Sequence, residues 1–277
     1  MTELNYRFTY DTLFKMLFVK FPYLLKRLVA AILGITADSI SEFIITNPDI
    51  PPEGLGDKFC RLDINMVVDG QRVDLEVQVA DEGDYPERSL YYWAREYSSA
   101  LKTSNPYSSL PRVILISIVD FPLFGCAEYH SEFLPLETKR HELLSDRMVL
   151  HYFELRKLPK RVSIQNELEL MLSLFGAKTE EELQQLEALE VPIVTQAIGA
   201  YREITVSPEF RELERLRADA RNNEASALAN AERRGYRKAE EKLQSVIAEK
   251  DAAIAEKDAE NEKLRKALAE LQSRADN

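Results

Sequence analysis

One stretch of the sequence, residues 59–79, limits the possible folds more than any other, because it has the pattern of two antiparallel strands joined by a tight turn. Asp69-Gly70 lies at its centre, and these residue types tolerate the positive φ angles that a type I′ turn requires. Side chains alternate between the two faces of a strand. One face is therefore apolar and predicts a hairpin that covers a core: Leu62, Ile64, Met66, Val68, Val73, Leu75, Val77 and Val79.

The opposite face of this hairpin is polar and carries acids: Asp63, Asn65, Arg72, Asp74, Glu76 and Gln78. With the Asp-Gly pair as the turn, Val68 pairs with Gln71. Counting outward along both strands then places Asp63 opposite Glu76. Facing carboxylates repel each other, and a bridging Mg²⁺ or Mn²⁺ would offset the repulsion, because these ions prefer oxygen ligands. The alternative is a solvated outer face of a meander, which needs no metal.

The segments around the hairpin predict an α/β order of elements. Apolar residues recur at helical spacing over residues 11–34, where Pro22 kinks or splits the helix. A short strand is expected over residues 42–46 and a helix over residues 86–103. Residues 112–119 form a continuous apolar run, which is typical of a buried central strand. The predicted order is helix, strand, strand, strand, helix, strand.

This order, with Asp63 followed by Glu76-Val77-Gln78, resembles the PD-(D/E)XK nuclease superfamily, whose metal-site signature is D…(D/E)xK. More narrowly, the chain resembles the recombination-promoting nuclease family, also labelled as transposases and widespread in bacteria. The resemblance covers about residues 5–210 and implies a restriction-endonuclease-like mixed-sheet core. Its pieces are specific as a set: DTLFK, RLDINMVVDGQRVDLEVQ, RSLYYWAREYSSAL, NPYSSLPRVILISIVDFPLF, YHSEFLPLE and LHYFEL.

The resemblance implies a metal-dependent DNA endonuclease in which Asp63 and Glu76 hold Mg²⁺ or Mn²⁺. Gln78 stands where the superfamily has lysine, so it offers an orienting hydrogen bond in place of a positive charge. Asp11 matches an acid on the family's first helix that contacts the metal or its water. The alternative is an ordinary first-turn acid that the helix dipole favours. Lys15, one turn later, would supply some of the missing positive charge.

The net charge of −11 argues against a generic DNA-coating protein, because nonspecific affinity for DNA comes from Lys and Arg. Residues 1–206 contain 21 basic and 31 acidic residues, so they hold most of the acidic excess. A nuclease with this balance must gather its basic residues on one face. Arg88, Arg95 and Lys102 recur every seven residues on the predicted helix after the hairpin, and we predict that they bind DNA.

Other features of the composition exclude several classes of protein. No apolar run reaches the roughly 18 to 20 residues of a membrane span, and the N-terminus lacks a signal-like apolar segment. A cytoplasmic protein without a membrane partner is expected. Cys60 and Cys126 lack the spacing of a zinc site and are expected to be free, buried thiols. The three histidines, His130, His141 and His151, are interpreted as structural.

The composition predicts three regions: a nuclease-like domain over residues 1–160, a helical cap over 161–206, and a long charged helix over 207–277. From residue 243 a heptad repeat can be written, with Leu243, Lys250, Lys257, Leu264 and Leu271 at d and Ile247, Ile254, Asn261, Leu268 and Ala275 at a. Asparagine at an a position favours two strands in one register. The heptad predicts a parallel coiled-coil homodimer, although two d positions are lysine. The alternatives are a monomeric solvated helix and a DNA contact by Arg233, Arg234, Arg237 and Lys238.

Two functions from different classes follow from these observations. The first is a DNA endonuclease linked to recombination or mobile elements. The second is a catalytically inactive protein of the same fold that acts as a dimeric scaffold through its tail. The acidic balance and the missing lysine favour the scaffold. The retained acids favour the nuclease, because an inactive site would gain stability by losing their repulsion. The nuclease is therefore the preferred hypothesis.

Overall fold

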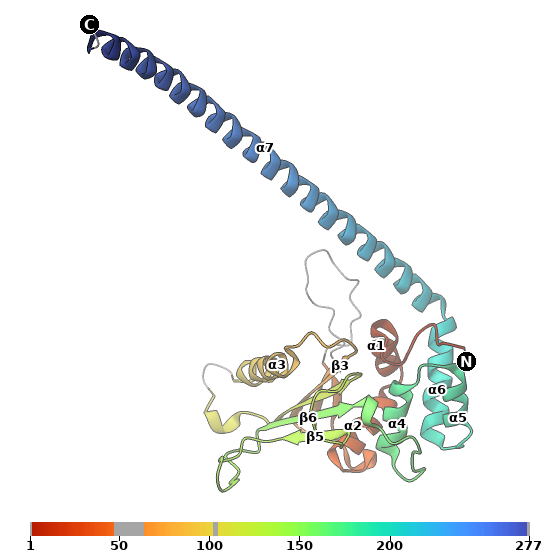
Figure 1. Cartoon of the computed structure of the whole chain (residues 1–277). Helices are drawn as coiled ribbons and strands as arrows, with labels where there is room; N and C mark the ends of the chain where they lie inside the picture. Colours follow the sequence, from red (N-terminus) through yellow and green to blue (C-terminus); the bar gives the residue numbers. More distant parts are fainter. Residues whose placement is uncertain (1, 47–63, 102–104, 276–277) are drawn as a thin grey trace. The chain divides into compact units, whose positions relative to one another are not determined.

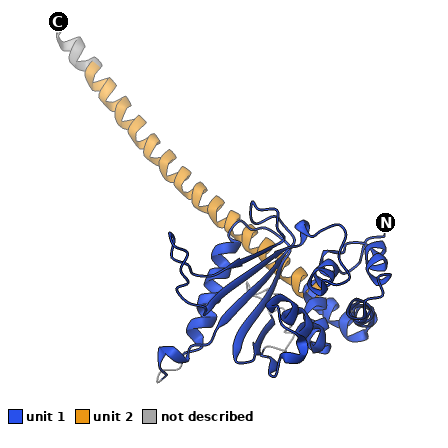
Figure 2. Cartoon of the chain, turned by 90° about the horizontal axis from the view of Figure 1, so that it is seen from below, with its two compact units in different colours: residues 1–217 blue, residues 218–277 orange. Residues whose placement is uncertain are grey.

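The computed structural model describes residues 2–46, 64–101 and 105–275, and of residues 269–275 the backbone alone. The chain divides into two units, Met1–Arg217 and Ala218–Asn277 (Figures 1 and 2). The first unit holds a mixed sheet with helices on both of its faces (Figure 1). The predicted α/β class with a mixed-sheet core is therefore confirmed.

The sheet has six strands in the order β1-β2-β3-β4-β6-β5. Strands β1, β2 and β3 are antiparallel, β3, β4 and β6 are parallel, and β5 is an antiparallel edge strand. The three parallel strands end at one edge, at Gln78, Val119 and Glu154, which we call the carboxyl edge. The bounds are β1 Phe43–Ile45, β2 Ile64–Val68, β3 Gln71–Gln78, β4 Val113–Val119, β5 His130–Phe133 and β6 Met148–Glu154.

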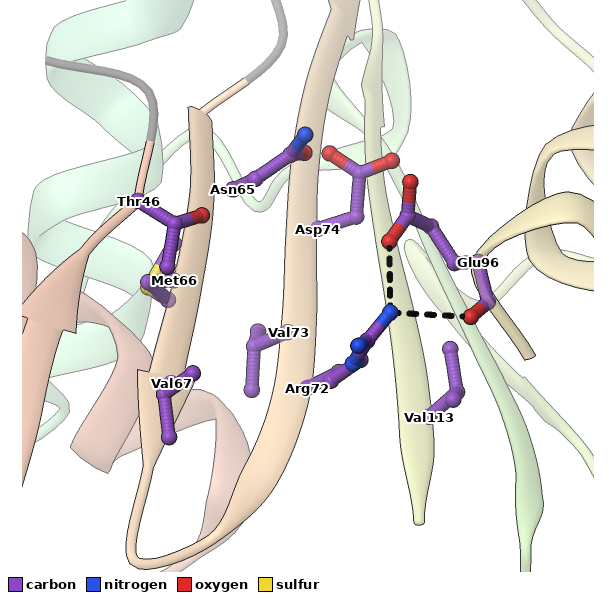
Figure 3. A pocket seen from close by; sticks show the side chains of 9 residues that line it. All are labelled: Thr46, Asn65, Met66, Val67, Arg72, Val73, Asp74, Glu96 and Val113. Carbon is purple, nitrogen blue, oxygen red and sulfur yellow. Dashed lines mark hydrogen bonds and ion pairs between the residues drawn. The ribbon is translucent and has the colours of Figure 1, made fainter. Parts of the chain in front are cut away.

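The hairpin of β2 and β3 has the predicted turn and register. Asp69 and Gly70 have φ angles of 46° and 76°, and Val68 pairs with Gln71. Figure 3 shows the consequence of alternation, with the side chain of Asp74 on the opposite face of β3 from that of Val73. One described residue of the predicted apolar face differs. Val79 is 47% exposed, because β3 ends one residue earlier, and Leu62 lies outside the described residues.

The N-terminal helical pattern forms two helices, as the position of Pro22 predicted. Pro22 is the first residue of the second helix, and Gly34 ends that helix in the left-handed conformation, with a φ angle of 68°. Short 3₁₀ helices follow at Ala37–Ser39, Tyr107–Ser109 and, after β6, at Leu155–Lys157 (η3). The α-helices are α1 Asp11–Lys20, α2 Pro22–Leu33, α3 Tyr85–Ser99, α4 Glu167–Gly176, α5 Glu180–Glu187, α6 Pro192–Val206 and α7 Pro208–Ala275.

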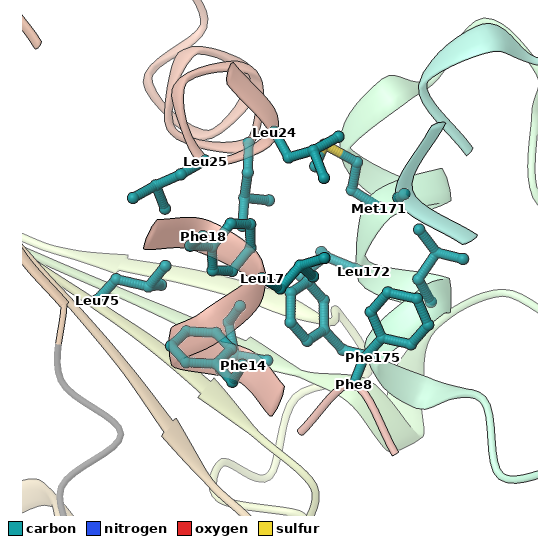
Figure 4. Packing of buried hydrophobic residues seen from close by; sticks show 14 of the residues in the cluster. Phe8, Phe14, Leu17, Phe18, Leu24, Leu25, Leu75, Met171, Leu172 and Phe175 are labelled. Carbon is teal, nitrogen blue, oxygen red and sulfur yellow. The ribbon is translucent and has the colours of Figure 1, made fainter. Parts of the chain in front are cut away.

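Separate cores cover the two faces of the sheet. Helices α1, α2, α4 and α6 bury the larger core, in which Phe14, Phe18 and Phe175 pack together (Figure 4). Helix α3 covers the other face through a smaller core, whose buried residues are Tyr85, Leu115, Val119, Phe121, Leu150 and Tyr152. Every residue of β4 is buried, as its uninterrupted apolar run predicted for a central strand.

The long helix predicted beyond residue 207 is present as α7. The helix starts where the composition changes, but the first compact unit continues into it as far as Arg217. In the second unit the described side chains from 221 to 268 are exposed, including those of Leu243, Ile247, Ile254 and Leu264. Among the described residues, no helix has the length and apolar character needed to span a bilayer.

Cys126 is free, as expected, but it is exposed rather than buried. It lies in the segment between β4 and β5, outside both cores, where its thiol is 3.8 Å from the Glu128 carbonyl oxygen. The thiol lies among polar groups, because Lys157 Nζ is also 3.8 Å from its sulfur. Cys60 lies outside the described residues.

Two of the three histidines, the buried His151 and the half-buried His130, contact each other. His151 on β6 is 5% exposed, and its Nδ1 lies 3.0 Å from Nε2 of His130 on β5. Burial, together with the neighbouring charges of His130 and Arg112, lowers the pKa of His151 to about 4. Burial also lowers the pKa of His130. Both rings are therefore neutral near pH 7 and act in packing, as the sequence predicted.

We expect His151 to make the stability of the chain depend on pH below neutrality. The ordinary pKa of histidine is about 6.5. Between that value and about 4 the unfolded chain binds a proton at this position that the folded chain does not. The free energy of unfolding therefore falls as the pH falls from about 6.5 to 4, by up to about 3 kcal/mol from this group.

Urea unfolding between pH 7.5 and 4.5 measures this effect. His151→Leu should remove that part of the pH dependence, whereas His141→Asn, at an exposed loop position with a positive φ angle, should keep it. Parallel stability profiles for the wild-type chain and His151→Leu would contradict the assignment.

Candidate active site

The polar face of the hairpin is buried beneath helix α3. Asp74 and Glu76 are 6% and 5% exposed, and both lie on the face of β3 that α3 covers. Tyr85, the first residue of α3, donates a hydrogen bond from its hydroxyl to Glu76 Oε2 at 3.1 Å. Because both carboxylates are buried, this face is not the solvated outer face of a meander. Burying carboxylates is costly unless they have a structural or chemical use.

Tyr85 is held in a form that can donate this hydrogen bond. Tyr85 is 1% exposed, and Pro86 follows it in the first turn of α3. Burial raises the pKa of Tyr85 well above its usual value, and the adjacent charge of Glu76 raises it further. The hydroxyl therefore stays protonated at any physiological pH. This donor fixes the position of one carboxylate oxygen of Glu76.

Further hydroxyl groups surround Glu76 on the neighbouring strands. Glu76 pairs in register with Ser117 of β4, which pairs in turn with Tyr152 of β6. The Tyr152 hydroxyl shares a hydrogen bond with Ser89 of α3, and both of these residues are buried. Burial raises the pKa of Tyr152, and its bond with Ser89 acts in the opposite direction. Glu76 is thus an acid among neutral polar groups in a water-poor site.

A small cavity of about 210 Å³ lies beside Asp74, between the hairpin and α3 (Figure 3). Arg72 borders it and donates hydrogen bonds to the Glu96 carbonyl oxygen at 3.1 Å and to Ser99 Oγ at 2.8 Å. Ligand pockets usually exceed about 300 Å³. This cavity is large enough for water or a small ion.

Gln78 lies at the end of β3, where its side chain is partly exposed. Its amide nitrogen donates a hydrogen bond to the carbonyl oxygen of Ala80 at 3.0 Å. Because Gln78 lies two residues after Glu76 on the same face of the strand, the sequence predicts that its amide points toward the acids. In the structure the amide nitrogen instead bonds within its own loop. The reason is that β3 ends here and the chain turns, which brings the Ala80 carbonyl within reach.

The described part of the site contains one side chain suited to bind a hard divalent cation. Glu76 provides a buried carboxylate oxygen, the donor type that Mg²⁺ and Mn²⁺ prefer. Asp63, the second predicted ligand, lies outside the described residues. Within the ranges that the structure describes, no three His, Cys, Asp or Glu side chains come close enough to hold a metal ion on their own.

Asp11 and Lys15 lie on α1, whose buried side chains pack into the core on the face of the sheet opposite α3. Asp11 Oδ2 forms an ion pair with Arg217 Nη1 at 2.9 Å, and Arg217 also donates to Thr12 Oγ1 at 2.6 Å. Glu214 accepts hydrogen bonds from Thr12 and Tyr10. Asp11 is therefore more than a first-turn acid, because it joins α1 to the beginning of α7.

The predicted DNA-binding residues on α3 are only partly available. Arg88 forms an ion pair with Glu82 at 2.6 Å and lies over the Tyr85 ring, 5.1 Å from its centroid. Arg95 is exposed and lies 6.0 Å from the centroid of the Tyr92 ring. Lys102 lies outside the described residues. Of the three, Arg95 is the side chain most open to a phosphate.

The sequence pattern did not reveal that Tyr85 bonds to Glu76, or that Asp120 forms ion pairs with Arg7, Arg156 and Lys178. No periodicity connects Tyr85 with Glu76, and the contact depends on how α3 lies over the sheet. Asp120 had a usable signal, because it directly follows the buried strand β4, and polar residues at the carboxyl ends of parallel strands often serve function.

Comparison with known families now adds to this geometry. A family model described as PD-(D/E)XK nuclease family transposase matches residues 9–231, from the start of α1 into α7. The chain belongs to this family. The match includes the D…ExQ motif, and it supports a nuclease-type function for this member of the PD-(D/E)XK nuclease family. No curated protein and no solved structure shows significant similarity to it.

Proposed function

We propose that this PD-(D/E)XK family member is a metal-dependent DNA endonuclease that acts in recombination or in the movement of mobile elements. The observation that carries the proposal is the buried carboxylate of Glu76, held by Tyr85 within the matched family region. A buried acid destabilises a fold. The position of Glu76 on β3, two residues before Gln78, agrees with the D…ExQ signature.

In this proposal Asp63 and Glu76 hold Mg²⁺ or Mn²⁺. The bound cation would polarise the phosphate and lower the pKa of its water. Tyr85 keeps the Glu76 carboxylate oriented, so that less rearrangement is needed when the cation binds. Gln78 would turn from Ala80 toward the substrate and orient it by a hydrogen bond.

Incubation of the full chain with supercoiled plasmid tests the proposal directly. Nicked or linear DNA should appear with Mg²⁺ or Mn²⁺ and should not appear with Ca²⁺ or a chelator. If no divalent ion supports cleavage of plasmid or of short duplexes, the second function stands: an inactive protein of this fold that acts as a scaffold.

Substitution of Gln78 measures the contribution of the missing positive charge. Gln78→Lys should keep the cleavage rate or raise it by up to about ten-fold, about 1.4 kcal/mol, since a cation replaces a neutral donor. Gln165→Lys, which adds the same charge at an exposed position, should leave the rate unchanged. Loss of cleavage in well-folded Gln78→Lys would show that glutamine has a role of its own.

We also propose that the chain forms a parallel dimer through residues 243–275. Most apolar a and d positions of the predicted heptad are described and are more than half exposed, as for Ile247 at 51% and Leu264 at 61%. An isolated helix of this composition gains little stability unless an apolar stripe packs against a partner. A second copy provides the matching stripe, with the two Asn261 side chains facing each other.

A further inference from the structure

Asp120, the residue after β4, gathers three positively charged side chains at the carboxyl edge of the sheet. Its carboxylate is 7% exposed and lies 2.9 Å from Arg7 Nη1, 3.4 Å from Arg156 Nε and 3.9 Å from Lys178 Nζ. The cations come from the N-terminal segment, from η3 and from the loop between α4 and α5. One carboxylate offsets one charge, so two positive charges remain in a chain of net charge −11.

This Asp120 cluster adjoins the end of the catalytic motif. The backbone N–H of Asp120 donates to the carbonyl oxygen of Gln78 at 3.0 Å, and Val119 pairs in register with Gln78. The cluster is therefore fixed by backbone contacts to the third residue of the D…ExQ signature. A DNA strand crossing the carboxyl edge beside Gln78 would pass over these cations.

Two of the three cations are accessible to a ligand. The side chains of Arg156 and Lys178 are 53% and 54% exposed, whereas that of Arg7 is 27% exposed. Arg7, at 2.9 Å, remains to compensate the buried charge of Asp120, so Arg156 and Lys178, at 3.4 and 3.9 Å, can exchange their contacts with Asp120 for contacts with a phosphate. A nearby acid, Glu182, already accepts the backbone N–H groups of Lys178 and Thr179.

We propose that Arg7, Arg156 and Lys178 bind a backbone phosphate of DNA beside the phosphate that is cleaved, with Asp120 holding the cations in place. The proposal rests on the proposed nuclease function. A single buried aspartate needs one cation for compensation, and the other two are more than half exposed. Arg7 and Arg156 present planar guanidinium groups, which suit paired hydrogen bonds to phosphate oxygens.

Binding of a fluorescent 30-base-pair duplex, measured by anisotropy in chelator, tests the cluster without any cleavage. Arg156→Ala/Lys178→Ala should weaken binding at least about ten-fold at 0.1 M salt and reduce the slope of log affinity against log salt by about 1 to 2. Lys139→Ala/Arg140→Ala removes the same charge from the β5–β6 connection, where both side chains are exposed. This control should lose less than two-fold.

Equal losses in the two double variants, an unchanged slope, or no DNA binding by the wild-type chain would overturn the proposal. Thermal unfolding checks that both variants are folded, and Lys178→Ala alone, whose contact with Asp120 is the longest, provides a milder version of the test. Because binding is measured in chelator, the result is independent of catalysis. A chain that binds through the cluster but cuts no plasmid would retain this inference and refute the nuclease.

Discussion

Glu76→Gln should reduce metal-dependent DNA cleavage by at least about 10³-fold, equivalent to about 4 kcal/mol of transition-state stabilisation. Glutamine keeps the shape of the side chain and an oxygen that accepts the hydrogen bond from Tyr85. The substitution removes the negative charge that the proposed cation needs. Asp63→Ala and Glu76→Ala should also abolish cleavage, although Glu76→Ala additionally leaves the buried Tyr85 hydroxyl without this acceptor.

A second measurement separates loss of the metal from loss of the fold. Mg²⁺ or Mn²⁺ should raise the unfolding temperature of the wild-type chain, because a ligand that binds the folded state stabilises it. Glu76→Gln should not respond. Glu142→Gln removes an equal charge from an exposed side chain in the β5–β6 connection and should behave as the wild type. Wild-type cleavage by Glu76→Gln would disprove the metal-site assignment.

Truncation within α7 should have opposite effects on either side of Arg217. Truncation after Glu209 removes Phe210, which is 1% exposed and packs edge-on against Tyr6 with ring centroids 4.8 Å apart. It also removes Arg217 and leaves Asp11 without this ion-pair partner. Loss of a buried Phe or of one member of a buried pair costs about 3 to 5 kcal/mol each. A domain stable by about 5 to 15 kcal/mol would then be largely unfolded.

Truncation after Glu224 keeps all of these contacts and removes the predicted heptad. We expect the chain that ends at Glu224 to unfold at the urea concentration that unfolds unit 1 of the full-length chain. It should sediment as a monomer and should nick supercoiled plasmid in preference to linearising it. A second cleavage centre, which a dimer supplies, is needed for a double-strand break in one binding event. A dimeric truncated chain would contradict the coiled coil, and a folded chain ending at Glu209 would contradict the importance of Phe210 and Arg217.

The features that sequence analysis predicted are local. The turn at Asp69-Gly70, the pairing of Val68 with Gln71 and the division of the first helix at Pro22 depend on neighbouring residues and on a period of two or 3.6. The same alternation placed Asp74 and Glu76 on one face. It did not show that this face is buried, because the burial comes from α3. Helix α3 contacts the sheet only through tertiary packing.

The contacts that sequence analysis did not predict join distant parts of the chain. Tyr85 reaches Glu76 because a helix starts at that point above β3. Arg7 and Lys178 reach Asp120 although 113 residues separate Arg7 from Asp120. No local spacing encodes such contacts. The predicted basic face of Arg88 and Arg95 followed the helical period correctly, yet the period could not reveal that Glu82 already pairs with Arg88.

The contact between α1 and the start of α7 affects how the protein folds during its synthesis. Tyr10, Asp11 and Thr12 are made early, but their partners Glu214 and Arg217 are made about 200 residues later. The contacts that join α1 to α7 in the first unit therefore form only after Arg217 has been synthesised. Translation at about 5 to 20 residues per second then needs about 3 to 12 s for residues 218–277. The first unit of each chain can thus fold before the tail that would join two chains is complete.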